Sequence, residues 1–196
     1  MSITLLKGQS IPLTNQEGQL LTQITIGLGW DAKNKKGYFG FGKAEQDVDL
    51  DISCIFFDQK HEPIDAVWFR ALKSQDGSVH HTGDNRTGLG SGDDEQIIVN
   101  LTQVPPHVRS LLFMVTSFSG QQFSRVKNLF CNLKEMQTKQ EVARFELISD
   151  KDEHTGQIMV NIYRDQAEWK IEAIGQSGFA RTFHELMPAA VQHLSQ

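Results

Sequence analysis

Carboxylate side chains gather in two short segments of this sequence. The first is an alternating run, Asp47-Val48-Asp49-Leu50-Asp51-Ile52. Successive side chains of an extended strand point to opposite faces, so Asp47, Asp49 and Asp51 would share one face at intervals of about 7 Å. Aspartate is a poor strand former, so three of them on one strand face need a reason. They either keep an exposed edge strand soluble or hold a cation.

The second segment runs from His81 to Glu95 and combines glycines with oxygen-bearing side chains. Glycine allows backbone conformations that turn carbonyl oxygens inward. Calcium takes six to eight oxygens from carboxylates, amides, carbonyls and water, whereas magnesium requires a stricter octahedron and zinc prefers nitrogen or sulfur. A flexible polar loop is the alternative interpretation, and the nearby aspartate run makes calcium the better one. The side-chain ligands expected from this segment are Asp84, Asn85, Asp93, Asp94 and Glu95.

Three familiar binding motifs are excluded by the residues at their key positions. The aspartate run matches the first three ligand positions of an EF-hand, but Ile52 stands where that loop needs glycine and Asp58 where it has glutamate. The glycines between 83 and 92 lack the Gly-Lys-Ser/Thr of a phosphate-binding loop, and residues 27–31 do not form a dinucleotide fingerprint. Nucleotide binding therefore has little support.

Other side chains with chemical potential are better explained by packing. His80 and His81 are adjacent, so on a strand they point to opposite faces and cannot ligate one metal together. Cys54 shares the apolar face of the aspartate run, where a free thiol is ordinarily buried and inert. Three tryptophans could form a platform for a sugar, although such residues more often fill the core: Trp30, Trp68 and Trp169. We expect no catalytic residues.

Composition limits the class of protein. The chain has 196 residues, 39% of them hydrophobic, which suits one domain spanning residues 1–196. With 24 acidic and 19 basic residues its net charge is -5, so nucleic acid is a poor partner. Its two cysteines have no zinc or disulfide spacing, which fits a reducing, cytoplasmic location. We also expect no signal peptide and no transmembrane segment.

Short alternating or β-branched segments separated by turn formers predict a mainly β chain. Nine such segments at this spacing favour a two-sheet β-sandwich. Helical spacing of apolar residues predicts one short helix at 123–130 and one at 180–194, the latter weakened by Pro188. The expected strands are 3–6, 21–28, 48–57, 66–72, 96–101, 110–119, 144–147, 158–164 and 169–175.

Five blocks of the sequence follow one another in a recognisable order: Gly27-Leu28-Gly29-Trp30-Asp31, residues 47–53, Lys73-Ser74-Gln75-Asp76-Gly77-Ser78-Val79, residues 81–95 and Ala167-Glu168-Trp169-Lys170. Together they resemble the TerD family of tellurium-resistance proteins. The insert Lys35-Lys36-Gly37-Tyr38-Phe39-Gly40 is most similar to the TerZ branch. Two positions depart from the family pattern: Ile52 replaces a usual alanine, and Arg86 with Leu89 alters the glycine-rich loop.

The resemblance implies calcium-binding loops at one end of the sandwich, holding two Ca²⁺ ions. The residues of this chain that fall in the family's acidic motifs are Asp31, Asp47, Asp49, Asp51, Asp84, Asn85, Asp93, Asp94 and Glu95. It also implies a role in resistance to tellurite, phage and colicins without an established catalytic activity. We therefore expect a scaffold that binds other Ter proteins and associates peripherally with the inner membrane, and no enzyme. The alternatives are a calcium-dependent carbohydrate- or ligand-binding module and, less favoured, a hydrolase or tellurite reductase.

Overall fold

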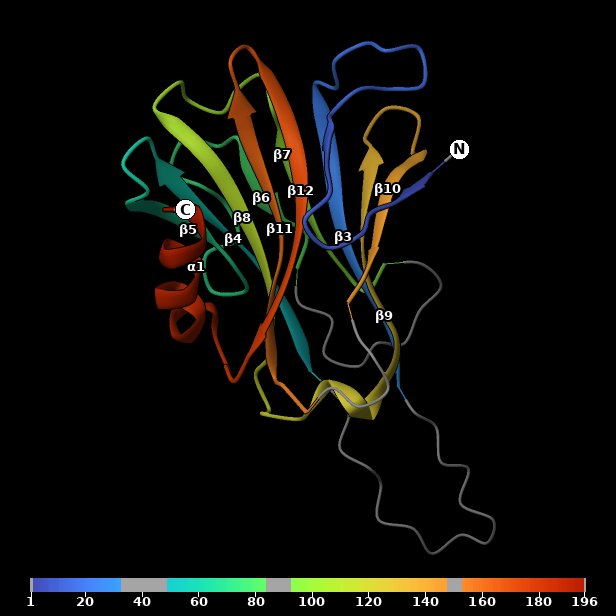
Figure 1. Ribbon diagram of the computed structural model, residues 1–196, viewed down its shortest axis with the longest axis vertical. Helices are drawn as coiled ribbons and strands as arrows, with labels where there is room; N and C mark the ends of the chain where they lie inside the picture. Colours follow the sequence, from blue (N-terminus) through green and yellow to red (C-terminus); the bar gives the residue numbers. More distant parts are fainter. Residues whose placement is uncertain (1, 33–48, 84–92, 148–152, 196) are drawn as a thin grey trace, which may run out of the picture.

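Two six-stranded β-sheets face each other in the computed structural model (Figure 1). The structure describes residues 2–32, 49–83, 93–147 and 153–195, with only the backbone of residues 31, 32 and 127. Asp47, Asp84 and Asn85, which the sequence predicts as metal ligands, lie outside the described residues. The side chain of Asp31 lies outside them too.

Sheet A contains two of the predicted acidic residues, Asp31 on β3 and Glu95 on β7. Its order is β1 (Ile3–Thr4), β10 (Glu141–Glu146), β9 (Val126–Glu135), β3 (Gln23–Ala32), β7 (Glu95–Asn100) and β6 (Val79–His81). Only β1 runs parallel to its neighbour, and all other pairs in this sheet are antiparallel. Leu28, near the end of β3, pairs with Glu95 at the start of β7, so the end of one strand meets the beginning of the other.

Sheet B contains Asp51, the last aspartate of the aspartate run. Its order is β2 (Ser10–Pro12), β12 (Glu168–Gly178), β11 (Gly156–Asp165), β8 (Val108–Ser117), β4 (Leu50–Asp58) and β5 (Pro63–Val67). Every pair in this sheet is antiparallel. Asp51 of β4 pairs with Thr116 of β8, which in turn pairs with Gly156 of β11. These three residues therefore form a row at one end of sheet B.

The main core lies between the sheets and follows strand alternation. Ile26 and Ile97 of sheet A and Phe113 and Ile162 of sheet B are fully buried members of one apolar cluster. Alternating apolar residues of β4, Leu50, Ile52 and Cys54, belong to the same cluster, as the pattern of the aspartate run predicts. Asp51 therefore points to the outer face of sheet B.

A second apolar cluster covers part of that outer face. Phe57 and Met114 of the sheet pack under the 3₁₀ turn η2 (Phe183–Leu186) and the helix α1 (Met187–Leu194). Pro188 lies in the first turn of α1, where an N–H has no partner within the helix and its loss costs nothing. The predicted C-terminal helix is thus present, but it begins later than residue 180.

Other expectations need correction. The predicted helix at 123–130 is wrong, because only Phe123–Arg125 forms a 3₁₀ turn (η1) and β9 starts at Val126. Phe130 explains the error: this outward-facing side chain lies under the guanidinium of Arg144, 3.5 Å from the ring centroid. An apolar residue on the outer face imitates helical spacing. The predicted strand at 66–72 overlaps β5 only at residues 66 and 67, because β5 ends at Val67. The sequence did not predict β2, β6 or β9.

Candidate functional site

Three chain segments that carry acidic residues meet where β3 ends and where β4 and β7 begin. The backbone N–H of Asp94 donates to the carbonyl of Leu28 at 2.8 Å, and the Oδ2 of Asp94 accepts the N–H of Trp30 at 2.9 Å. Glu95 reaches Ile52 of β4. We call this region, residues 28–31, 49–52 and 93–95, the acidic end. Its hydrogen bonds fix the three segments relative to one another.

Glu95 links the two sheets through a buried carboxylate. Its Oε2 accepts the backbone N–H of Ile52 at 2.8 Å, and the residue is 1% exposed. In the register of the two strands, β5 first pairs with β4 at Cys54, so the N–H of Ile52 lies beyond the paired part of β5. A buried N–H without an acceptor costs about 1–3 kcal/mol, and Glu95 removes that cost.

His81 completes this buried group. Its Nε2 lies 3.5 Å from the Oε2 of Glu95, and neither side chain is exposed. The Nδ1 of His81 accepts the N–H of Gly83 at 3.1 Å, so in a neutral ring the proton is on Nε2, facing Glu95. His80, by contrast, is exposed, which confirms that the two histidines point to opposite faces.

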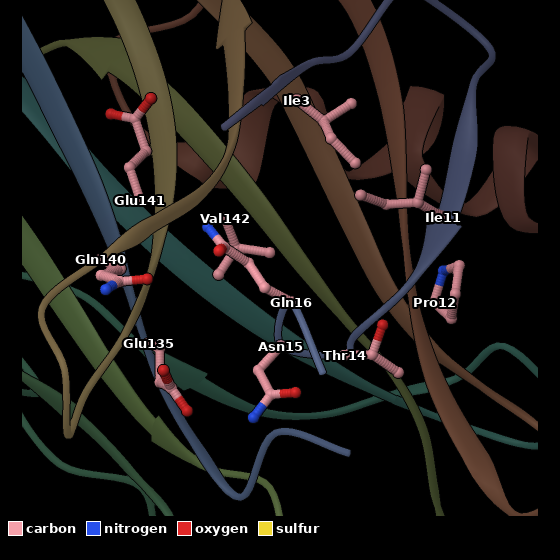
Figure 2. Close-up of a pocket in the computed structure, with 10 residues that line it drawn as sticks. All are labelled: Ile3, Ile11, Pro12, Thr14, Asn15, Gln16, Glu135, Gln140, Glu141 and Val142. Carbon is pink, nitrogen blue, oxygen red and sulfur yellow. The ribbon is translucent and has the colours of Figure 1, made fainter. Parts of the chain in front are cut away.

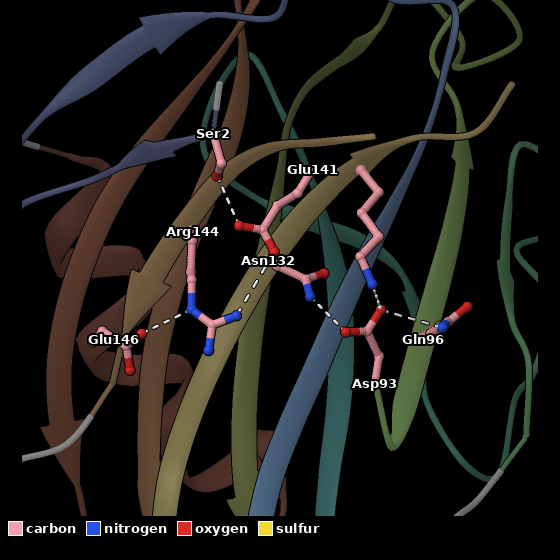
Figure 3. Close-up of polar contacts among 8 residues, drawn as sticks. Ser2, Asp93, Gln96, Asn132, Glu141, Arg144 and Glu146 are labelled. Atoms are coloured by element: carbon pink, nitrogen blue, oxygen red, sulfur yellow. Dashed lines mark hydrogen bonds and ion pairs between the residues drawn. The ribbon is translucent and has the colours of Figure 1, made fainter. Parts of the chain in front are cut away.

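Asp93 points to the outer face of sheet A, where three side chains surround its carboxylate (Figure 3). The distances to Lys134 Nζ and Asn132 Nδ2 are both 2.5 Å, and Gln96 Nε2 lies at 3.3 Å. The Asp93 side chain is only 1% exposed. Gly27 makes room for it, because a Cβ at that position would lie 2.5 Å from the Asp93 carboxyl carbon.

Two further predicted ligands whose side chains the structure describes, Asp49 and Asp51, lie directly before β4 or on it. Asp51 is 5% exposed on the outer face of sheet B, and Asp49 is half-buried just before the strand. Asp31 pairs through its backbone with Lys127 across β3 and β9. Thus Asp51, Asp93 and Glu95 point to three different places: outside sheet B, outside sheet A and between the sheets.

This divergence limits what the described residues can bind by themselves. No group of three or more His, Cys, Asp or Glu side chains within the described ranges could hold a metal ion. The carboxylate oxygens predicted from the sequence are of the type that calcium prefers. Three of the predicted ligands, Asp47, Asp84 and Asn85, lie in the segments 33–48 and 84–92, which the structure does not describe.

The sequence did not predict the partners of the acidic residues. Asn132 and Lys134 alternate on the outer face of β9, a strand whose first half resembled a helix. A lysine and an amide two residues apart carry no signal by themselves. Their pairing with Asp93 depends on strand order, which places β9 beside β3.

The cysteines have the features of packed core residues. Both Cys54 and Cys131 are free and buried. Burial raises the pKa of the Cys131 thiol to about 12 and raises the pKa of Cys54 well above its usual value. Trp30 and Trp169 are 3% and 9% exposed within the main core, and partly buried Trp68 packs against the second cluster. Core packing is therefore the better explanation for these residues.

A groove of about 240 Å³ lies away from the acidic end (Figure 2). It is lined by Ile3 and Ile11 from the edge strands β1 and β2 and by Glu135, which pairs with Ile24 near the start of β3. The two carboxylates at this groove already have partners: Glu135 accepts from Thr138, and Glu141 accepts from Ser2.

Among the helices the structure describes, none has the length and apolar character needed to cross a membrane.

Comparison of the sequence with known proteins identifies the family of this chain. A TerD domain model matches residues 1–189. The tellurium resistance protein TerZ of Serratia marcescens is 41% identical over 186 residues, which covers 94% of each chain. General stress protein 16U of Bacillus subtilis is 36% identical over 191 residues, or 92% of this chain and 95% of that protein.

The fold is also similar to that of a solved homologue of the telluride resistance protein TerD from Streptomyces coelicolor A3(2). The TM-score is 0.64, with 18% identity over 83% of this chain and 92% of that one. At this identity the likeness concerns the fold alone. The family match, however, extends over nearly the whole length, and it confirms the resemblance that the sequence blocks indicated. The chain therefore belongs to the TerD family, which includes the tellurium resistance proteins TerZ and TerD.

Proposed function

We propose that this protein is a calcium-binding component of a bacterial stress-resistance system and acts by binding other molecules rather than by catalysis. One observation carries the proposal: the three acidic segments 28–31, 49–52 and 93–95 meet at one end of the sandwich. The described carboxylates of these segments point to different faces, but they share one end of the sandwich, where a divalent cation would offset their negative charge.

The donors expected around the ions are oxygens of the residues predicted from the sequence. Asp49, Asp51 and Asp94 lie at or directly before strand ends that lead into the segments 33–48 and 84–92. Asp47, Asp84 and Asn85 would complete the ligand set, together with Asp31. Bound calcium would supply positive charge and bridge these segments. The binding surface would then form only when calcium is present.

The names of the relatives suggest where such a surface acts. One relative is a tellurium resistance protein and another is a general stress protein. We therefore place this chain in resistance to tellurite and related stress, as a scaffold that recognises other Ter proteins at the inner membrane. A calcium-dependent carbohydrate module is less well supported, since burial of Trp30 and Trp169 leaves neither ring available as a sugar platform.

The test is a calorimetric titration of EDTA-treated protein with Ca²⁺, with Mg²⁺ and Zn²⁺ as comparison ions. We expect one or two Ca²⁺ per chain. At a hundredfold excess over Kd, binding should stabilise the fold by about 2.7 kcal/mol, and hence raise the melting temperature by roughly 5–10 °C. Absence of calcium binding at millimolar concentration would refute the proposal.

Variants separate specific ligation from general charge. Asp49→Asn and Asp84→Asn should weaken calcium binding and lower tellurite resistance in complemented cells. Asp165→Asn removes the same charge from the far end of β11, about 30 Å from Gly156 by the rise of nine residues. This control should leave both properties unchanged. Equal losses in all three variants would show that overall charge, not a site, governs binding.

A further inference from the structure

A small polar pocket of about 170 Å³ lies on the outer face of sheet B, beside the C-terminal end of α1. Four of its lining residues form a block on three adjacent strands. Tyr163 of β11 pairs with Ser110 of β8, and Asn161 of β11 pairs with Glu172 of β12. Strand alternation puts all four on the outer face, because neighbours such as Ile162 and Ile171 belong to the main core.

Two buried polar atoms of this block have no hydrogen-bond partner within the described chain. They are the Oγ of Ser110 and the Oδ1 of Asn161. Their residues are 2% and 5% exposed. Buried polar groups are almost always hydrogen-bonded, and an unsatisfied one costs about 1–3 kcal/mol. Both residues line the same pocket, which far exceeds the roughly 10–15 Å³ that one water requires.

The pocket also contains charges of both signs. Arg109 and Glu172 line it, and neither forms a salt bridge with any other described residue. Two histidines lie at the same pocket, His193 in the last turn of α1 and His61 in the turn after β4. The Asp58 carboxylate positions that turn by accepting the N–H groups of Lys60 and Glu62.

We infer that this pocket binds a small carboxylate that also carries a hydrogen-bond donor, as an α-amino or α-hydroxy acid does. The guanidinium of Arg109 matches the geometry of a carboxylate. The donor of the ligand would supply the hydrogen bond that Asn161 Oδ1 lacks, and the Ser110 hydroxyl can donate or accept.

Other ligand classes satisfy fewer of these groups. Inorganic phosphate would pair with Arg109 but would bring more negative charge close to Glu172 than a monocarboxylate does, without the ammonium group by which an amino acid offsets it. A neutral sugar would leave the guanidinium without a counter-charge, and an apolar ligand would leave both buried oxygens unsatisfied. Thr116, which pairs with Asp51 at the acidic end, lies about 20 Å from Ser110 along β8. Binding here is therefore separate from the proposed calcium site.

The test is calorimetry and amide-shift mapping by NMR on the full chain, with L-serine and L-lactate as probes and phosphate and glucose as comparisons. We expect saturable binding of serine or lactate at millimolar concentration or below, with shifts at the pocket. The preferred probe tells an amino acid from a hydroxy acid. EDTA should leave this binding unchanged.

Variants decide which groups are responsible. Arg109→Gln and Asn161→Leu should each weaken binding by about tenfold, the equivalent of one charge-assisted hydrogen bond. Arg70→Gln is the matched control, because Arg70 lies over Trp68 and Phe69 elsewhere on the surface. If Asn161→Leu fails to fold, Asn161→Asp keeps the shape but repels a carboxylate. Failure of both probes to bind, preference for phosphate or glucose, or unchanged affinity in the pocket variants would overturn the inference.

Discussion

Replacement of Glu95 by leucine should destabilise the fold even when no metal is present. The carboxylate is buried, accepts the N–H of Ile52 at 2.8 Å and faces the Nε2 of His81 at 3.5 Å. Leucine has a similar size but no acceptor, so the N–H of Ile52 loses its hydrogen bond and the His81 ring loses the carboxylate 3.5 Å away. An unsatisfied buried N–H costs about 1–3 kcal/mol, loss of the carboxylate beside His81 adds to this cost, and the added apolar burial offsets part of it, which gives a loss of about 3 kcal/mol.

A glutamine at the same position separates charge from hydrogen bonding. Its amide oxygen can still accept from Ile52, so the variant loses only the difference between a charged and a neutral acceptor, about 1 kcal/mol. Glu146→Gln is the control, because that side chain is 54% exposed beside Arg144 and should change stability by less than about 0.5 kcal/mol.

The assay is denaturant and thermal unfolding of each variant in EDTA. A loss of about 3 kcal/mol in a chain of this length corresponds to a fall of roughly 6–12 °C in the melting temperature. If Glu95→Leu unfolds like the unaltered protein in EDTA and loses only the stabilisation by calcium, the reasoning is refuted. Glu95 would then serve as a metal ligand and not as a bridge between the sheets.

Two further predictions concern the surroundings of the acidic end. Lys134→Met leaves the Asp93 carboxylate, 1% exposed, with amide donors only, and should cost about 2 kcal/mol in urea unfolding because the lysine itself is 27% exposed. Recovery of this loss by Ca²⁺ would identify Asp93 as a ligand, whereas no loss at all would contradict the role of the pair. Since burial raises the thiol pKa values, to about 12 for Cys131, neither Cys131 nor Cys54 should react with a disulfide reagent near pH 8 until the chain unfolds. The stability that comes from keeping these thiols neutral is lost as pH rises from about 8.5 towards 12. The denaturant concentration at the midpoint of unfolding should therefore fall over this pH range. Rapid labelling of the folded protein would contradict burial of the thiols.

The local pattern of the sequence predicted much of the fold because apolar and polar residues alternate along most strands. The apolar positions of the aspartate run, Leu50, Ile52 and Cys54, are all in the core between the sheets. Alternation failed where an outward-facing residue is apolar, as at Phe130, which Arg144 covers. It also missed β2 and β6, which have three residues each, because so short a strand carries no period.

The acidic segments that meet at one end were visible in the sequence, but the directions of their side chains were not. The sequence identified Asp93, Asp94 and Glu95 as neighbours on the chain. It could not indicate that Asp93 turns to Lys134 on one side of sheet A while Glu95 turns to Ile52 on the other. These directions depend on pairing between residues about 40 positions apart, which no local spacing encodes.

The hydrogen bonds of the acidic end bear on how calcium would bind there. A carboxylate offers about four acceptor positions on its two oxygens, so accepting one backbone N–H leaves it able to ligate an ion. Asp94 is held by Trp30 and Glu95 by Ile52, which fixes these carboxylates to β3 and β4 independently of any metal. Calcium binding would then cost the protein less conformational entropy than binding by an unattached acidic loop would. The structural role of these residues is therefore compatible with the metal binding that we propose, and measurements in EDTA and in calcium separate the two.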